Sequence, residues 1–342
     1  MLLYQQNDPS MESQWRAIIL FGRNVQSYKF ALAHSLLELT SKEKTIISLE
    51  ELSEPFSRHI INHLKINDKQ GTPKTSAFLD VCRSMRDGSL NQNELISKTQ
   101  KLAFGNVIDR FHIVGGDVVP IKFYEKDYST RQKRLVITDD LLRLKESIQF
   151  NNFDSEVEAR WNLVETAWNL NLPSNLLNVN YDDEGEIFFT QDDRMKRVNV
   201  TSARDSLNGY QKGKCFYCFK DIILLEGAGD IAHVDHFFPH KNKLQHQANI
   251  NGVWNLVLAC QECNSGTDGK FVKIPDIKYL ERLTKRNAFF IDSHHPLRET
   301  LINQTGESPE KRRKFLQEQN KIAIENSIQY GWKPKNEHEA TF

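Results

Sequence analysis

Three stretches of the sequence decide the fold: CFYC at 215–218, AHVDHFFP at 232–239 and NGVWNLVLACQECN at 251–264. The first and the third each contain a Cys-x-x-Cys pair. Two tight turns with two thiolates each supply the four soft ligands that a tetrahedral Zn²⁺ site prefers, and a site closed by four thiolates has no position for water. We therefore expect a structural zinc, whose ligands would be Cys215, Cys218, Cys260 and Cys263.

The alternative is that one of the two pairs is incidental, since Cys-x-x-Cys also occurs in redox sites. A redox motif needs a single pair, however, and here two pairs flank a cluster of histidine and aspartate. The fifth cysteine, Cys82, stands alone in SAFLDVCRSM and has the setting of a buried helix residue. In a cytosolic chain, paired cysteines of this kind favour a metal over a disulfide.

The run between the two pairs alternates like a strand and contains Asp235 next to His236. Neighbouring strand residues point to opposite sides, so this pair needs a twist or bend to converge on one phosphate. His233 would share a strand face with Asp235. For an isolated Asp-His dipeptide, a surface ion pair would be the simpler interpretation.

The order Asp-His, Asn-Leu and Cys-x-x-Cys-Asn resembles the HNH endonuclease family in its zinc-stabilised form. The resemblance implies a ββα-metal core, in which two strands and a helix surround one catalytic metal ion. It is confined to residues 200–275. It is specific because the Asn-Leu and Cys-x-x-Cys-Asn elements follow the Asp-His pair in the family's order.

This resemblance implies a role for each motif residue. His236 would be the general base, because an imidazole titrates near working pH and can take a proton from the attacking water. Asn255 would fix the loop and orient the histidine. Asp235 and Asn264 would supply hard oxygen ligands to a catalytic Mg²⁺ or Mn²⁺. The expected products carry a 5′-phosphate and a 3′-hydroxyl.

Several basic side chains near the motif are candidates for binding phosphate. His233 lies on the strand, while His240, Lys241 and Lys243 follow it in a polar loop. Members of the family often place a lysine three residues after the last asparagine, whereas here the next lysine is Lys270. Each of these side chains has a simpler alternative as a solvated surface residue.

Three functional classes remain open on the sequence. The first is a DNA endonuclease, for which a bacterial restriction or phage-defence system is one setting. The second is an RNA-cleaving toxin of the same fold, because the motif reads a phosphate and not the sugar. The third is a non-catalytic zinc module that binds nucleic acid or protein. One HNH site cuts one strand, so a double-strand break would need a homodimer or two successive nicks.

The rest of the chain predicts an α+β protein with a mainly helical N-terminal part. Apolar residues recur at helical spacing before residue 105, and Ser48 with Glu51 forms a capping box. VVPIKFY at 118–124 and RLVIT at 134–138 are expected to be short strands, followed by a helix in TDDLLRLKESI. We assign 1–150 to one mixed domain of unknown role in recognition, partner binding or regulation.

Three further regions complete the predicted organisation. Residues 151–199 would form a helical connector and an acidic hairpin at YDDEGE, residues 200–275 the nuclease domain, and residues 276–342 a helical C-terminal extension.

Composition places few limits on function. The 342 residues carry a formal net charge of zero and are 39% hydrophobic, as in ordinary soluble proteins. A surface that binds DNA or RNA must therefore be a local patch, and the basic runs 131–134 and 311–314 are candidates. No stretch has the composition of a membrane span or leader, so we expect a cytoplasmic protein with no membrane partner.

Overall fold

A computed structural model describes residues 8–22, 24–73, 75–129, 131–172, 177–191, 196–225, 230–242, 246, 248–293, 295–327 and 329–342. The chain has a mixed α and β structure with small sheets. The contacts between its residues divide the chain into two compact units, Met1–Asn171 and Leu172–Phe342. The four-part division proposed from the sequence remains a prediction. None of the described helices is long and apolar enough to cross a membrane.

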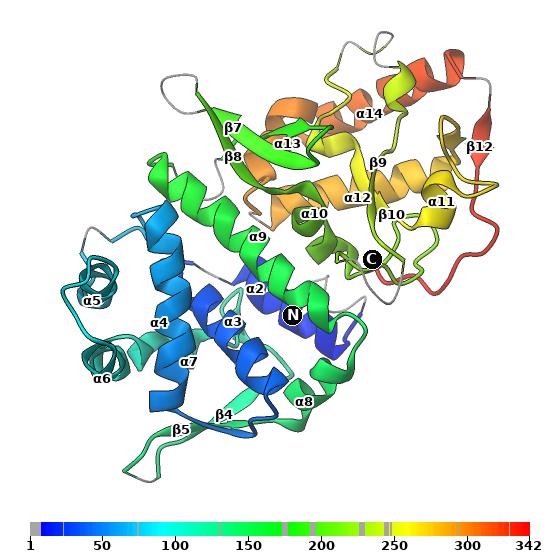
Figure 1. Cartoon of the computed structure of the whole chain (residues 1–342). Helices are drawn as coiled ribbons and strands as arrows, with labels where there is room; N and C mark the ends of the chain where they lie inside the picture. Colours follow the sequence, from blue (N-terminus) through cyan, green and yellow to red (C-terminus); the bar gives the residue numbers. More distant parts are fainter. Residues whose placement is uncertain are drawn as a thin grey trace. The chain divides into compact units, whose positions relative to one another are not determined.

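The first unit is mainly helical (Figure 1), and its buried apolar side chains form one core. Ser48 and Glu51 form the predicted capping box, and Cys82 is fully buried in a helix, as expected. The helices are α2 (Met11–Phe21), α3 (Tyr28–Ser41), α4 (Leu49–Ile66), α5 (Ala77–Arg86), α6 (Gln92–Leu102), α7 (Phe104–Arg110), α8 (Asp139–Glu146) and α9 (Phe150–Asn169).

A small sheet closes the first unit, with β5 (Arg134–Ile137) between β1 (Ile46–Ser48) and β4 (Tyr124–Asp127) and antiparallel to both. The strand predicted at 134–138 is confirmed. The strand predicted at 118–124 is wrong, because the chain bends after the short pair β2 (Ile113–Val114) and β3 (Asp117–Val118) and β4 begins only at the end of that run. Pro120 lies in the bend, and a proline has no N–H for a strand ladder.

A buried polar layer joins α4 to α9. The ring of His63 stacks on Trp161 with centroids 3.5 Å apart. Its Nδ1 lies 2.9 Å from the Glu165 carboxylate, which also accepts from Gln70, and its Nε2 lies 3.3 Å from Glu158. Burial lowers the pKa of His63, but the hydrogen bonds to both glutamates outweigh this effect and raise the pKa to about 9. The imidazolium is therefore part of the folded structure at neutral pH.

This layer predicts a pH dependence. The folded pKa of His63 lies above its unfolded value, so its stabilisation is fully present below pH 6.5 and is lost as pH rises through about 9. Relative to His63→Gln, the wild type should be more stable by about 3 kcal/mol at pH 6 and by little at pH 10. Urea denaturation at both pH values measures the difference. The exposed His338→Gln should show no such trend, and a constant difference for His63→Gln would contradict the assignment.

The second unit begins with a hairpin sheet and continues into the motif region. β7 (Ile187–Gln191) lies between β6 (Asn180–Asp182) and β8 (Arg197–Ser202), so the acidic run 181–186 forms a hairpin, as predicted. After α10 (Ala203–Gln211), β9 (His233–His236) pairs antiparallel with β10 (Leu256–Ala259). The elements that flank this pair are the turns η1 (His240–Asn242) and η2 (Val253–Asn255) and the helix α11 (Gln261–Ser265).

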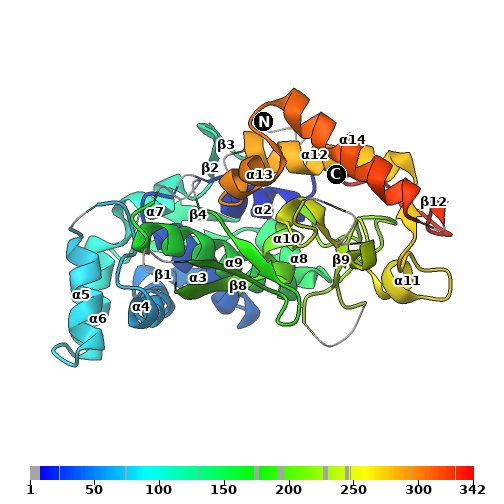
Figure 2. The same cartoon turned by 90° about the horizontal axis from the view of Figure 1, so that it is seen from above.

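The C-terminal part of the second unit packs on the β9–β10 region. α12 (Ile277–Asp292) contacts η2, and α13 (Arg298–Thr305) and α14 (Pro309–Glu325) pack on α12 and on each other (Figure 2). The parallel pair β11 (Ile274–Pro275) and β12 (Tyr330–Trp332) brings the end of the chain back beside α11. Helices occupy most of the range Ile277–Glu325, as predicted, whereas Tyr330–Trp332 is a strand and residues 333–342 contain no helix.

Candidate functional site

Four cysteine side chains meet beside the β9–β10 pair. All are buried, and their sulfur atoms lie within 4.8 Å of one another. The Sγ atoms of Cys218 and Cys260 are 3.7 Å apart. Zn–S bonds of about 2.3 Å in a tetrahedral site place neighbouring sulfurs about 3.8 Å apart, so the cluster could hold a zinc ion. The four residues are those the sequence singled out, namely Cys215, Cys218, Cys260 and Cys263.

The backbone around the cysteines forms two tight turns. In the first, the N–H of Phe219 donates to the carbonyl of Cys215, and Phe219 itself is left-handed with φ of 59°. In the second, Cys260 immediately precedes α11, and the N–H of Asn264 donates to the carbonyl of Cys260. Burial raises the pKa of the Cys215 thiol, so a thiolate there needs a neighbouring positive charge. The donor set therefore fits a bound Zn²⁺, which deprotonates coordinating thiols.

Metal analysis tests this assignment directly. The purified chain should contain one zinc per molecule, and Cys260→Ser should lose it. Because zinc-binding energy is folding energy, the loss should lower the unfolding temperature of the second unit by roughly 10 °C, equivalent to about 3 kcal/mol. Cys82→Ala is the matched control and should keep its zinc. A wild type free of zinc, or a Cys260→Ser chain that retains it, would refute the site.

The Asp235 carboxylate lies between the two cysteine turns. Its Oδ2 accepts a hydrogen bond of 2.7 Å from the hydroxyl of Tyr217, which belongs to the first Cys-x-x-Cys pair. Its Oδ1 accepts from Lys270 Nζ at 3.1 Å. Tyr217 and Lys270 are both fully buried. The carboxylate is thus fixed by one donor from the sequence around each cysteine pair.

Lys270 makes more contacts than the sequence indicated. Its ammonium also donates to the main-chain carbonyls of His236 at 2.9 Å and Phe271 at 3.2 Å. Its own N–H donates to the carbonyl of Cys263. A buried ammonium without an acceptor is costly, and here all three protons have one. The structure directs the ammonium of Lys270 to Asp235. A role of Lys270 in phosphate binding remains a prediction.

A double-mutant cycle measures the buried pair. Lys270→Met or Asp235→Asn alone leaves one buried charge without its partner and should cost about 3 kcal/mol of unfolding free energy. The double variant should cost less than the sum of the single variants, because each removes the same interaction. Denaturation of the zinc-loaded chain provides the four values. Lys311→Met removes an exposed pair with Glu307 and should change stability by less than about 0.5 kcal/mol. Strict additivity would contradict the contact.

His236 ends β9 and faces a different set of residues. Its Nε2 lies 2.9 Å from Asn251 Oδ1 and 4.0 Å from Asp183 Oδ1, on the acidic hairpin. Because an amide oxygen only accepts, His236 donates its Nε2 proton to Asn251 and keeps a lone pair on Nδ1. Burial lowers the pKa of His236, and the carboxylates of Asp183 and Asp235 oppose this only in part. The imidazole is therefore neutral at pH 7.

Asn255 is fully buried and closes the loop around His236. Its Oδ1 accepts from the N–H of Phe238 at 2.8 Å, and its Nδ2 donates to the carbonyls of Phe238 and Ile250 at 3.0 and 2.9 Å. These bonds fasten the segment after β9 to the segment that contains Asn251. Asn255 therefore fixes the loop, while the side chain that contacts His236 belongs to Asn251. The sequence gives no indication that Asn251 contacts His236, apart from its position four residues before Asn255.

α12 donates hydrogen bonds to the turn that contains Asn255. The buried Arg286 donates through Nη2 to the carbonyls of Val253 at 3.2 Å and Leu256 at 2.7 Å, on either side of Asn255. Gly252 allows this tight course, since a Cβ there would lie 2.5 Å from the Trp254 ring. The C-terminal helices thus help to fix the position of Asn255.

The remaining predicted residues that the structure describes lie on β9, on η1 and on α11. Asn264 is half-buried on α11, and its side-chain amide makes no hydrogen bond to the residues described. His233 is half-buried opposite Ala259 on β10. The His240 ring centroid lies 5.2 Å from that of His236, and Lys241 is exposed next to it. Lys243 lies outside the described residues.

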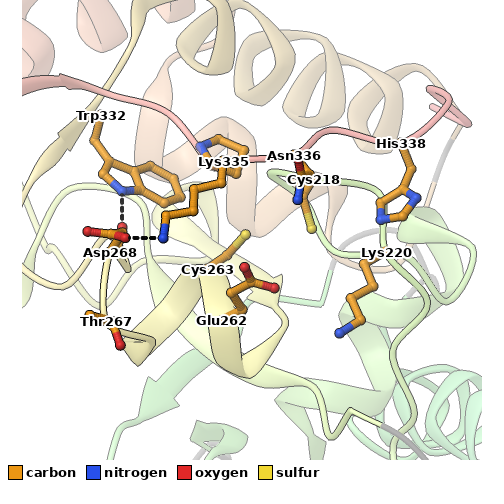
Figure 3. A pocket seen from close by; sticks show the side chains of 11 residues that line it. Cys218, Lys220, Glu262, Cys263, Thr267, Asp268, Trp332, Lys335, Asn336 and His338 are labelled. Carbon is orange, nitrogen blue, oxygen red and sulfur yellow. Dashed lines mark hydrogen bonds and ion pairs between the residues drawn. The ribbon is translucent and has the colours of Figure 1, made fainter.

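A cavity of about 270 Å³ opens on another side of the cysteine cluster (Figure 3). The C-terminal segment crosses it, and Trp332 and Lys335 both contact Asp268 there. None of the predicted catalytic side chains lines this cavity. Its lining residues are Cys218, Lys220, Glu262, Cys263, Thr267, Asp268, Trp332, Pro334, Lys335, Asn336 and His338.

Comparison of the chain with protein-family models, with curated proteins and with solved structures finds no match.

Proposed function

We propose that this chain is a metal-dependent endonuclease of the HNH, or ββα-metal, type that hydrolyses phosphodiester bonds in DNA. The observation that carries the proposal is the grouping on one strand pair. Asp235 and His236 end β9, Asn255 immediately precedes β10, and Asn264 lies on α11, which follows β10. A buried cluster of four cysteines adjoins them. A role in restriction or phage defence remains a prediction.

In the proposed reaction His236 is the general base. Its Nδ1 lone pair accepts a proton from the attacking water, while the hydrogen bond from Nε2 to Asn251 holds the ring and its tautomer. Asn255 maintains the position of the base by joining the loop segments on both sides of it. Without this support the imidazole would sample other orientations. Correct orientation of a catalytic group contributes a large share of the rate acceleration.

Asp235 and Asn264 are the proposed ligands of Mg²⁺ or Mn²⁺. An ionised carboxylate has about four lone-pair sites, and Tyr217 and Lys270 occupy two of those on Asp235. The Asn264 amide oxygen is an uncharged oxygen donor of the type these ions accept. A bound ion would polarise the scissile phosphate and stabilise the departing 3′ oxygen. His240 and Lys241, next to the base, are the proposed contacts to the flanking phosphates.

Supercoiled plasmid provides the test. With Mg²⁺ or Mn²⁺ the wild type should convert it to nicked circles and then to linear DNA, and EDTA should prevent this. His236→Ala should lower the nicking rate at least 100-fold, because the proton acceptor is gone. His338→Ala removes an exposed imidazole outside the proposed site and should cut at the wild-type rate. The reaction is followed on agarose gels over time.

The possible outcomes separate the classes of function. Equal activity in His236→Ala would overturn the assignment of the base. Cleavage of single-stranded RNA but not of plasmid would replace the DNA substrate by RNA. Retained zinc with no cleavage of either polymer would favour a non-catalytic zinc module. Linear DNA that appears together with nicked circles would indicate two sites acting at once, as in a homodimer.

A further inference from the structure

One donor to Asp235, Tyr217, belongs to the first cysteine turn, and the other, Lys270, is hydrogen-bonded to the second. Tyr217 lies between Cys215 and Cys218, so its position is set by the first turn. The N–H of Lys270 donates to the carbonyl of Cys263 at 2.7 Å, so its backbone is attached to the second turn. The carboxylate that we propose as a metal ligand is therefore connected to the cysteine cluster from both sides.

We propose that Tyr217 and Lys270 are positioning residues through which the four-cysteine cluster sets the geometry and the affinity of the catalytic metal site. The inference rests on the proposed function for the identity of that second site. It assigns to the cluster a role beyond holding the fold together. The ordered turns keep the Asp235 carboxylate in one orientation, which leaves its remaining lone pairs available to an ion.

Contacts on the other side of each donor support the assignment. The Tyr217 ring is wedged between aromatic rings, with centroids 5.6 Å from Tyr279 and 5.2 Å from Trp332. Its hydroxyl therefore has little freedom to leave Asp235. Lys270 bonds in addition to the main-chain carbonyl of His236, so one ammonium fixes both the carboxylate and the backbone of the proposed base.

The second turn also continues to Asn264. The N–H of Phe271 donates to the carbonyl of Asn264 at 3.1 Å, one residue after Lys270. Phe271 has φ of 45°, a left-handed conformation that non-glycine residues rarely adopt without surrounding support. Both proposed ligands are thus tied to the segment that follows Cys263. Disorder in that segment would loosen Asp235 and Asn264 together.

Tyr217→Phe is the decisive variant, because it deletes one hydroxyl and changes neither charge nor ring packing. Removal of a hydrogen-bond partner behind a metal ligand typically costs 10- to 100-fold in affinity. Lys270→Met is unsuitable here, since losing the ammonium also changes the charge that faces the ion. Tyr279→Phe is the matched control, because its buried ring neighbours Tyr217 while its hydroxyl contacts Glu337.

The experiment titrates Mn²⁺ into the zinc-loaded full-length chain and follows free Mn²⁺ by electron paramagnetic resonance. We expect Tyr217→Phe to bind Mn²⁺ about 10-fold more weakly while its zinc content stays at the wild-type level. Tyr279→Phe should match the wild type. In cleavage assays the Mn²⁺ concentration for half-maximal rate should rise by the same factor, with the rate at saturating Mn²⁺ largely recovered. A purely structural hydroxyl would not produce that pattern.

Two outcomes would overturn the inference. One is unchanged Mn²⁺ affinity in Tyr217→Phe with full zinc content, and the other is an equal loss in Tyr279→Phe. The proposed function fails separately: a chain that binds Mn²⁺ in a Tyr217-dependent manner but cuts neither DNA nor RNA would support the positioning role and refute the nuclease. A wild type that binds no Mn²⁺ would overturn both.

Discussion

The structure around the site depends on the meeting of two cysteine pairs that are far apart in sequence. Cys218 and Cys260 bring their sulfur atoms to 3.7 Å, and all four thiols are buried. Four thiols this close are favourable when a soft cation neutralises them, and four thiolates saturate a tetrahedral ion. Closing this cluster fixes the ends of the segment that contains β9 and β10. A zinc ion held by the four cysteines would therefore tie both ends of the strand pair together, although each of its strands is short.

The second requirement is that charged groups buried next to this frame have partners. Asp235 and Lys270 are both buried, and an isolated charge at either position would be strongly unfavourable. The Tyr217 hydroxyl donates a hydrogen bond to the Asp235 carboxylate, and two main-chain carbonyls accept the remaining protons of the Lys270 ammonium. Such a network is stable only when every member is satisfied. It explains why a polar centre can be rigid, which a site for catalysis or metal binding requires.

The same principle appears in the first unit, where the buried Glu165 of α9 has His63 of α4 and Gln70 as partners. That layer is fixed by pairing across helices and not by a local motif. The sequence indicated the helices through their apolar periodicity and the capping box at Ser48, yet it gave no sign that His63 stacks on Trp161. Contacts between positions about 100 residues apart have no signature in local spacing.

Some features followed from the sequence alone. The meeting of the four cysteines, the strand that contains Asp235 and His236, and most helices were predictable, because ligand spacing, strand alternation and helical periodicity are local properties of a chain. The strand at 118–124 was misplaced, because Pro120 breaks the ladder where apolar character suggested continuity. Only the tertiary structure decided that Lys270 bonds Asp235 and that Asn251, rather than Asn255, contacts His236. The physical reason is that hydrogen-bond partners depend on how distant segments pack, and burial then requires each polar group to find one.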